Sequence, residues 1–219
     1  MTNIAACIFD LDGVIVDTAI YHFKAWKNLA DELGINFTEE HNERLKGVSR
    51  TRSLEIILEI GSLTLDEAVK ESLATKKNTE YLELVNQMTA DEILPGVTDF
   101  LNDLKASGIK LALGSASKNA RTILEKINLL EKFDAIVDGT LVQKAKPDPE
   151  VFLLASHMLD VAPENCVVFE DAVAGVEAAK NAGMYCVGVG KPEILTQADQ
   201  VIASFEGFSL ANIKATSRV

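Results

Sequence analysis

The sequence predicts an α/β fold class: a Rossmann-like core with a doubly wound parallel sheet, interrupted by an inserted all-helical domain. Short apolar runs alternate with segments of helical periodicity along most of the chain, as in a parallel sheet that helices cover on both faces. One long stretch near the N-terminus shows helical periodicity alone. The chain has 219 residues, more than one domain of about 150 residues requires. These three observations favour a single core divided by an insertion.

Six apolar runs are predicted to form the strands of the core. They are short, and several are apolar at successive positions, which is typical of buried parallel strands. Four segments between them repeat apolar residues at helical spacing, and Gly108 and Gly183 follow two of these segments as C-cap glycines would. The predicted strands are residues 4–9, 110–114, 135–137, 166–169, 186–189 and 200–203, and the predicted helices are 97–107, 119–127, 149–159 and 173–182.

The insertion contains helical patterns only. Apolar side chains recur at helical spacing in three segments, of which the first two end at Gly34 and Gly61. We expect Phe23 and Trp26 to pack in the core of this domain. The predicted boundaries are 1–16 and 92–219 for the discontinuous core and 17–91 for the helical domain, with short hinges near residues 14–18 and 89–95.

The composition is that of an ordinary globular protein and restricts its partners. Hydrophobic residues make up 47% of the chain and charged residues 25%, so disorder is not expected. The net charge of −12 argues against nucleic acid or an anionic membrane as a partner. A small anionic substrate remains compatible, because the local field of a site can oppose the net charge.

The apolar runs and the cysteines point to a soluble cytoplasmic protein. The first apolar run ends at Asp10, too early for a signal peptide, and no run approaches the roughly 18 residues of a membrane span. Cys7, Cys166 and Cys186 lie in apolar stretches without metal-ligand spacing. We therefore expect buried, free thiols, as in a reducing compartment.

Polar residues follow several predicted strands, and the carboxyl ends of parallel strands form the edge where ligands bind. Each residue alone is more often a helix cap or a turn residue. Together, clustered carboxylates require a cation, and their hard oxygen atoms suit Mg²⁺. Serines at a helix N-terminus and a lysine suit phosphate, so the set predicts phosphoryl transfer. Its members are Asp10, Asp12, Ser115, Ser117, Lys146, Glu170 and Asp171.

The order of these motifs resembles that of the haloacid dehalogenase superfamily. Residues 10–14 (Asp-Leu-Asp-Gly-Val) resemble its motif I, Ser115 motif II, Lys146-Pro147 motif III and Glu170-Asp171 motif IV. The helical insertion directly after motif I resembles the family's small α-helical cap. The resemblance therefore covers nearly the whole chain.

The resemblance implies a role for each of these residues. Asp10 would be the nucleophile that forms an aspartyl-phosphate, and Asp12 the general acid/base, whose presence argues against dehalogenation. Ser115 and Lys146 would bind the transferring phosphoryl group. One Mg²⁺ per chain would be held by Asp10, the backbone carbonyl of Asp12, Asp171, and Glu170 as a ligand or close neighbour.

Parts of the insertion resemble the β-phosphoglucomutase family more narrowly. The resemblance lies in residues 17–18, 21–26 and 45–50, together with residues 114–119 of the core. It implies that Arg50 binds the non-transferring phosphate and that Lys46 contacts the sugar and gates closure of the cap. It also implies that His22 positions Asp12 and that Thr18 lies in the hinge. The further substrate-binding candidates are Gly47, Val48, Ala116, Ser117, Lys118 and Asn119.

The function implied is an isomerase that interconverts β-D-glucose 1-phosphate and β-D-glucose 6-phosphate. The route would pass through the aspartyl-phosphate and β-glucose 1,6-bisphosphate, which is also the activator. The alternatives are a magnesium-dependent sugar-phosphate phosphatase and a non-catalytic sugar-phosphate-binding regulator, although a regulator has no need of a nucleophile with an acid/base. We expect a monomer whose partner is a small sugar phosphate.

Four further residues carry weaker expectations. His41 and His157 lack any supporting pattern and are expected on the surface. Lys77 is a candidate to face the cleft. Arg52 stands where other family members often carry an acid, and it is expected to alter the local charge.

Overall fold

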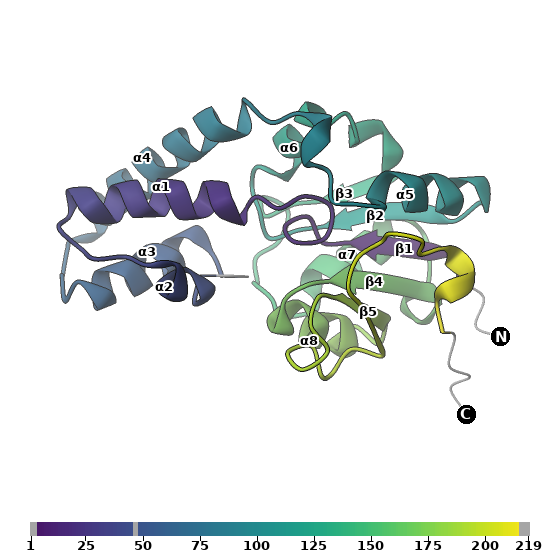
Figure 1. Cartoon of the computed structure of the whole chain (residues 1–219). Coiled ribbons are helices and arrows are strands. Elements are labelled where there is room, and N and C mark those ends of the chain that lie inside the picture. Colours follow the sequence, from purple (N-terminus) through teal and green to yellow (C-terminus); the bar gives the residue numbers. More distant parts are fainter. Residues whose placement is uncertain (1–3, 46–47, 215–219) are drawn as a thin grey trace. The chain divides into compact units, whose positions relative to one another are not determined.

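The computed structural model describes residues 4–45 and 48–214. The chain divides into two compact units: Met1–Asp17 with Thr89–Val219, here the core unit, and Thr18–Met88, here the cap unit. The cap unit is thus an insertion between the first strand of the core unit and the rest of it (Figure 1).

A six-stranded parallel sheet in the order β3-β2-β1-β4-β5-β6 forms the centre of the core unit. The predicted fold class is confirmed, and each predicted strand lies within two residues of an observed one. Strand order reverses at β1, which pairs with β2 on one side and with β4 on the other, and such a switch point is where open α/β sheets bind ligands. The strands are β1 (Ala6–Phe9), β2 (Lys110–Gly114), β3 (Ala135–Val137), β4 (Cys166–Glu170), β5 (Tyr185–Val189) and β6 (Gln200–Ile202).

The four predicted core helices are confirmed within two residues at each end. Gly108 and Gly183 follow two of them in the left-handed conformation (φ 74° and 75°), which glycine adopts without strain. The helices are α5 (Val97–Ala106), α6 (Ala120–Lys126), α7 (Glu150–Met158) and α8 (Val173–Asn181), with short 3₁₀ helices at Ala90–Glu92 (η1), Leu130–Lys132 (η2), Pro163–Asn165 (η3) and Leu210–Asn212 (η4).

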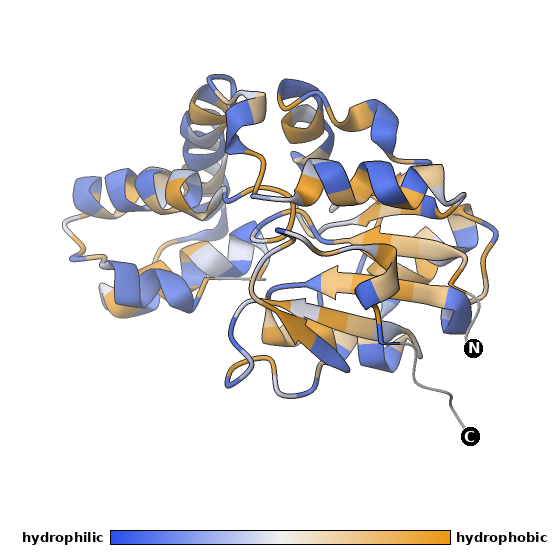
Figure 2. Ribbon diagram, turned by 45° about the vertical axis from the view of Figure 1, so that its right-hand side comes forward, coloured by the Kyte–Doolittle hydropathy of each residue, from blue (hydrophilic) through white to orange (hydrophobic). Residues whose placement is uncertain are grey.

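The strands are largely apolar, as the orange colour of the arrows in Figure 2 shows. Both of their sides are apolar because helices cover both faces of the sheet. Successive side chains of a strand point to opposite faces. Ile8 of β1 accordingly packs in a buried cluster with Phe152 of α7. The next residue, Phe9, faces the other side, where its ring centroid lies 6.1 Å from that of Phe100 of α5.

An aromatic cluster supports β1 and β4 just before the site. Phe9 and Phe169 are register partners, and their rings stack with centroids 4.7 Å apart. Phe100 contacts both rings, and Phe205 and Phe208 close the cluster from the segment after β6. The sequence did not predict this cluster, because its members lie far apart in the chain without a shared local pattern.

Helices are the only regular secondary structure among the described residues of the cap unit, 18–45 and 48–88. Trp26 is 2% exposed in its core and Phe23 packs against that core, as predicted. Ser49 and Asp66 cap two of its helices by accepting hydrogen bonds from the Arg52 and Val69 backbone N–H groups. The helices are α1 (Ala19–Glu32), α2 (Glu39–Glu43), α3 (Arg50–Ile60) and α4 (Glu67–Val85).

The three cysteines are buried and free, as predicted. Burial raises the pKa of each thiol, that of Cys166 to about 12, so these side chains serve as small apolar core residues. Among the described helices, none has the length and apolar character needed to cross a membrane.

Candidate active site

Two acidic residues lie side by side at the carboxyl ends of β1 and β4. The backbone N–H of Asp10 donates to the carbonyl of Phe169 (2.9 Å), so Asp10 extends β1 beside the end of β4. Asp10 is 7% exposed and Glu170 1% exposed. Two buried carboxylates at neighbouring positions are costly unless a positive charge pairs with them.

Lys146 supplies that charge. Its Nζ lies 2.5 Å from Oδ1 of Asp10 and 2.6 Å from Oε1 of Glu170, and it also donates to the carbonyl of Gly114 (3.2 Å). Burial opposes the charge of Lys146, but Asp10 and Glu170 outweigh this effect and raise its pKa above the usual value. The ammonium group therefore joins the ends of β1, β2 and β4.

A sharp turn after Asp10 brings the chain against Asp171. Gly13 has a φ of 75°, a conformation that favours glycine. A Cβ atom at this position would overlap Oδ2 of Asp171 and lie 2.5 Å from its Cγ. Gly13 is thus required both for the turn and for the close approach of Asp171. Asp12 lies in the same turn and is half-buried.

The carboxylates form one electrostatic cluster. Burial raises the pKa of Asp171 to about 8, and the negative charges of Glu170, Asp10 and Asp12 add to the rise, while Lys146 opposes it. The charges of Asp10, Asp12 and Glu170 thus act on Asp171 with Lys146 opposing them, and such a group of hard oxygen donors fits a divalent cation. In the described part of the chain, no three acidic, histidine or cysteine side chains are grouped as a metal site.

The segment after β2 carries the predicted phosphate-binding residues. Ser115 is buried, and its Oγ accepts a hydrogen bond from the Ser117 N–H (3.1 Å). The Oγ of Ser117 in turn accepts from the N–H of Asn119 (3.2 Å). Ala116 and Lys118 are exposed. Because Gly114 accepts from Lys146, this segment begins directly beside the carboxylates.

Asp138 lies beside the segment after β2, and the sequence analysis did not single it out. It follows β3 and is 4% exposed, and its Oδ1 accepts from the Thr140 N–H (2.9 Å). A Cβ at the next residue, Gly139, would overlap the carbonyl oxygen of Ala116. The turn after β3 therefore supports the segment after β2. The signal that singled out Asp10, an acid directly after a strand, could have found Asp138.

The cap unit contains a histidine–lysine pair. Nδ1 of His22 lies 2.8 Å from Nζ of Lys77, and the His22 ring stacks on that of Tyr81 with centroids 4.1 Å apart. Nζ of Lys77, which is 2% exposed, also lies 4.5 Å from the ring centroid of Trp26. Burial, Lys77 and Arg50 hold the pKa of His22 well below 6.5. The sequence singled out both residues without predicting that they pair.

The other predicted cap residues lie at helix starts or outside the described residues. Thr18 is buried at the N-terminus of α1, where its carbonyl accepts from the His22 N–H (3.0 Å). Arg50 is half-buried at the first position of α3, and Val48 is 36% exposed. Lys46 and Gly47 lie outside the described residues.

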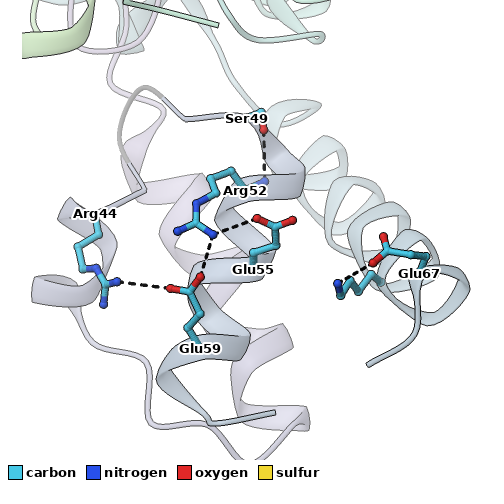
Figure 3. Close-up of polar contacts among 7 residues, drawn as sticks. Arg44, Ser49, Arg52, Glu55, Glu59 and Glu67 are labelled. Atoms are coloured by element: carbon cyan, nitrogen blue, oxygen red, sulfur yellow. Dashed lines mark hydrogen bonds and ion pairs between the residues drawn. The ribbon is translucent and has the colours of Figure 1, made fainter. Parts of the chain in front are cut away.

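The charge of Arg52 is matched within the cap unit. Its NH1 lies 3.0 Å from Oε2 of Glu55 and 2.8 Å from Oε1 of Glu59 (Figure 3). Arg44 lies 3.9 Å from the same Glu59 on its other oxygen. The expected change in local charge is thus offset by two neighbouring glutamates on α3.

The two remaining histidines differ from each other. His157 is exposed, as predicted. His41 is half-exposed and, beyond the predicted surface position, it takes part in a helix cap. Its Nδ1 accepts from the Thr38 N–H and its own N–H donates to Oγ1 of Thr38 (both 3.3 Å), which is the reciprocal geometry of a capping box at the start of α2.

Comparison with known proteins relates most of the chain to one family. Residues 4–183 match the haloacid dehalogenase-like hydrolase family. The β-phosphoglucomutase of Bacillus subtilis (strain 168) is 46% identical over 207 residues, which cover 94% of this chain and 92% of the relative. A phosphorylated carbohydrates phosphatase of Thermotoga maritima is 36% identical over 82% of each chain. The crystal structure of β-phosphoglucomutase from Clostridium difficile is 44% identical, with a TM-score of 0.91 over 95% of this chain and 94% of that chain.

The His22–Lys77 pair predicts a histidine that stays neutral in mildly acidic solution. Replacing Lys77 with Met removes a positive charge 2.8 Å from Nδ1, so the pKa of His22 should rise toward 6.5. Titration of the histidine ring resonances by NMR measures this, with His22→Gln identifying the signal among the three histidines.

The same pair affects stability. Because the unfolded chain takes up a proton that the folded protein excludes, His22 should lower the free energy of unfolding as the pH falls below about 6.5. Urea unfolding of the wild type and of His22→Gln at pH 5 and 7 measures the difference. In the NMR titration, a wild-type His22 resonance that titrates near 6.5 would contradict the lowered pKa of His22.

Proposed function

This chain belongs to the haloacid dehalogenase-like hydrolase family, and from this premise we propose that it is a β-phosphoglucomutase. It is an isomerase that interconverts β-D-glucose 1-phosphate and β-D-glucose 6-phosphate. The observation that carries the proposal is the joining of Asp10 and Glu170 by Lys146 at the switch point of the sheet, with Asp12 two residues beyond the nucleophile. The relative named β-phosphoglucomutase, 46% identical over nearly the full length, supports the same reaction.

Asp10 acts as the nucleophile and Asp12 as the general acid/base. Asp10 carries a phosphoryl group at the start of the cycle, and Asp12 takes the proton from the attacking sugar hydroxyl. Breaking the acyl phosphate bond frees the Asp10 carboxylate and gives β-glucose 1,6-bisphosphate. Covalent capture divides the transfer into two easier steps.

The second half of the cycle reverses the first with the other phosphate. The bisphosphate reorients, and Asp10 attacks the phosphorus at C1. Asp12 returns the proton to the leaving oxygen of the sugar, which releases glucose 6-phosphate and restores the phosphorylated Asp10. Ser115 and Lys146 bind the phosphoryl oxygens in both halves, where the Lys146 ammonium offsets the negative charge.

We propose that each chain binds one Mg²⁺. Asp10, the carbonyl of Asp12, Glu170 and Asp171 would hold it. Burial and the negative charges of Glu170, Asp10 and Asp12 raise the pKa of Asp171, and a bound cation would balance those charges. Mg²⁺ bound there would neutralise negative charge on the transferring phosphoryl group.

The cap residues are proposed to recognise the substrate. Arg50 binds the non-transferring phosphate, which suits the two-pronged guanidinium group, and Lys46 contacts the sugar. His22 positions Asp12, and Thr18 lies in the hinge. Gly47 and Val48 belong to the same loop as Lys46, while Ala116, Ser117, Lys118 and Asn119 complete the distal site from the core side.

Exclusion of water separates this reaction from the alternative, a sugar-phosphate phosphatase. Both share the aspartyl-phosphate, and a phosphatase transfers the phosphoryl group to water. Because a phosphatase from Thermotoga maritima is 36% identical, the experiment must distinguish phosphatase activity from mutase activity. The proposal further includes a monomer in the cytoplasm, consistent with free buried cysteines.

A dual-product assay tests the proposed reaction. The protein, β-glucose 1-phosphate, Mg²⁺ and a catalytic amount of β-glucose 1,6-bisphosphate are incubated, and glucose 6-phosphate and inorganic phosphate are measured separately. Glucose 6-phosphate should dominate. Inorganic phosphate as the main product would favour the phosphatase, and no turnover would favour a binding protein.

The roles of the two aspartates predict different losses. Asp10→Asn should abolish the phosphoenzyme, because it removes the nucleophile. Asp12→Asn should slow transfer by about 10²-fold or more, yet leave Mg²⁺ affinity nearly unchanged, because the predicted ligand is its backbone carbonyl. Acid-quenched labelling measures the phosphoenzyme and calorimetry the metal affinity. Equal loss of metal binding in both variants would contradict the role of Asp12.

Two neighbouring arginines provide a matched pair for the phosphate site of the cap. Arg50→Ala should raise the KM for β-glucose 1-phosphate by about tenfold or more, since hydrogen bonds to a charged group contribute about 1.5–3 kcal/mol. Arg52→Ala should change it little, because Arg52 is engaged by Glu55 and Glu59. Steady-state kinetics decides: equal effects of the two substitutions would rule out a special role for Arg50.

A further inference from the structure

The carboxylate of Glu170 is held from two directions. Its Oε1 accepts from Nζ of Lys146 (2.6 Å), and its Oε2 accepts from the backbone N–H of Ala172 (2.8 Å), the residue that precedes α8. Glu170 is 1% exposed. Its side chain therefore folds back onto the first turn of α8 instead of extending from the end of β4.

Gly175 is the residue of α8 that this carboxylate meets. A Cβ atom at residue 175 would overlap Cδ and Oε1 of Glu170 and would lie 2.5 Å from Oε2. These are the three nearest atoms, so the space that a side chain would fill is the space of the Glu170 carboxyl group. Gly175 is buried within the helix and its φ is not in the left-handed region. Its backbone does not require glycine, and alanine is the better helix former.

We propose that Gly175 is a positioning residue for phosphoryl transfer: its missing side chain is what lets Glu170 reach Lys146 and the metal-binding edge. This inference rests on the proposed function for the role of Glu170. It is supported by the contrast with Gly183 at the other end of the same helix, which has a positive φ and no atom within 4 Å of a Cβ. Glycine at position 183 allows a left-handed backbone conformation, whereas glycine at position 175 leaves room for the Glu170 side chain.

Helix α8 also contacts the segment that carries Lys146. Nδ2 of Asn181, the last residue of α8, donates to the carbonyl of Pro147 (3.1 Å). One helix thus contacts Glu170 at its first turns and the Lys146–Pro147 segment at its end. A shift of α8 would disturb this second contact. The atoms that a Cβ at residue 175 would meet are the end of the flexible Glu170 side chain, so the carboxylate is expected to move.

Gly175→Ala is therefore expected to displace the Glu170 carboxylate from Lys146. Loss of an oriented carboxylate at or next to a metal should weaken Mg²⁺ binding by about tenfold or more. Glu170→Asp shortens the side chain by one methylene group and withdraws the carboxylate from residue 175. The substitution Gly175→Ala should then have little further effect, because its steric partner has already moved.

The experiment is a double-mutant cycle with Mg²⁺ affinity as its readout. Isothermal titration with Mg²⁺ is performed on the wild type, Gly175→Ala, Glu170→Asp and the double variant. Gly175→Ala should weaken binding by about tenfold or more in the wild-type background and by less than about twofold in the Glu170→Asp background. The control is Lys180→Ala, a substitution on the same helix that removes an ion pair with Asp199, and it should leave the affinity unchanged.

Each outcome of this experiment either supports or overturns the proposed role of Gly175. Equal effects of Gly175→Ala in both backgrounds, or wild-type affinity in Gly175→Ala, would overturn the proposal. If Gly175→Ala does not fold, as judged by circular dichroism in EDTA, recovery of folding in Gly175→Ala with Glu170→Ala would support it. Failure of that double variant to fold would overturn it. Because the readout is metal affinity, the result stands apart from which sugar phosphate the protein converts.

Discussion

A buried ammonium group holds the site of this protein together. Lys146 lies within hydrogen-bond distance of Asp10, Glu170 and the carbonyl of Gly114, and these residues end three adjacent strands of the sheet. Without that charge, two carboxylates with 7% and 1% exposure would repel each other in a medium of low dielectric. The position of Asp10 therefore depends on a residue 136 positions away in the chain.

Two glycines and two phenylalanines shape the surroundings of this ion cluster. Gly13 and Gly175 leave the room that Asp171 and Glu170 occupy. The rings of Phe9 and Phe169, register partners on the paired strands β1 and β4, stack immediately before Asp10 and Glu170. The room left by the two glycines and the aromatic packing before the strand ends place the acids at the same edge of the sheet, and phosphoryl transfer requires such positioning.

The fold and the core of the site could be predicted from the sequence because their signals are local. Apolar runs marked the six strands, and an acid or serine directly after a run marked Asp10, Ser115 and Glu170. The pairing of His22 with Lys77, and the space at Gly175, arise from residues far apart in sequence or from an atom that is missing. No periodicity reports such contacts, so they became visible only when the chain was folded.

The central claim, that Lys146 is the counter-charge of Asp10 and Glu170, is tested most directly by a cycle on the free energy of unfolding in EDTA. Lys146→Met should cost about 3–5 kcal/mol in the wild type, because it leaves buried charge unpaired. In the background of Asp10→Asn with Glu170→Gln, the same substitution should cost about 1 kcal/mol or less. An equal cost in both backgrounds would contradict the account.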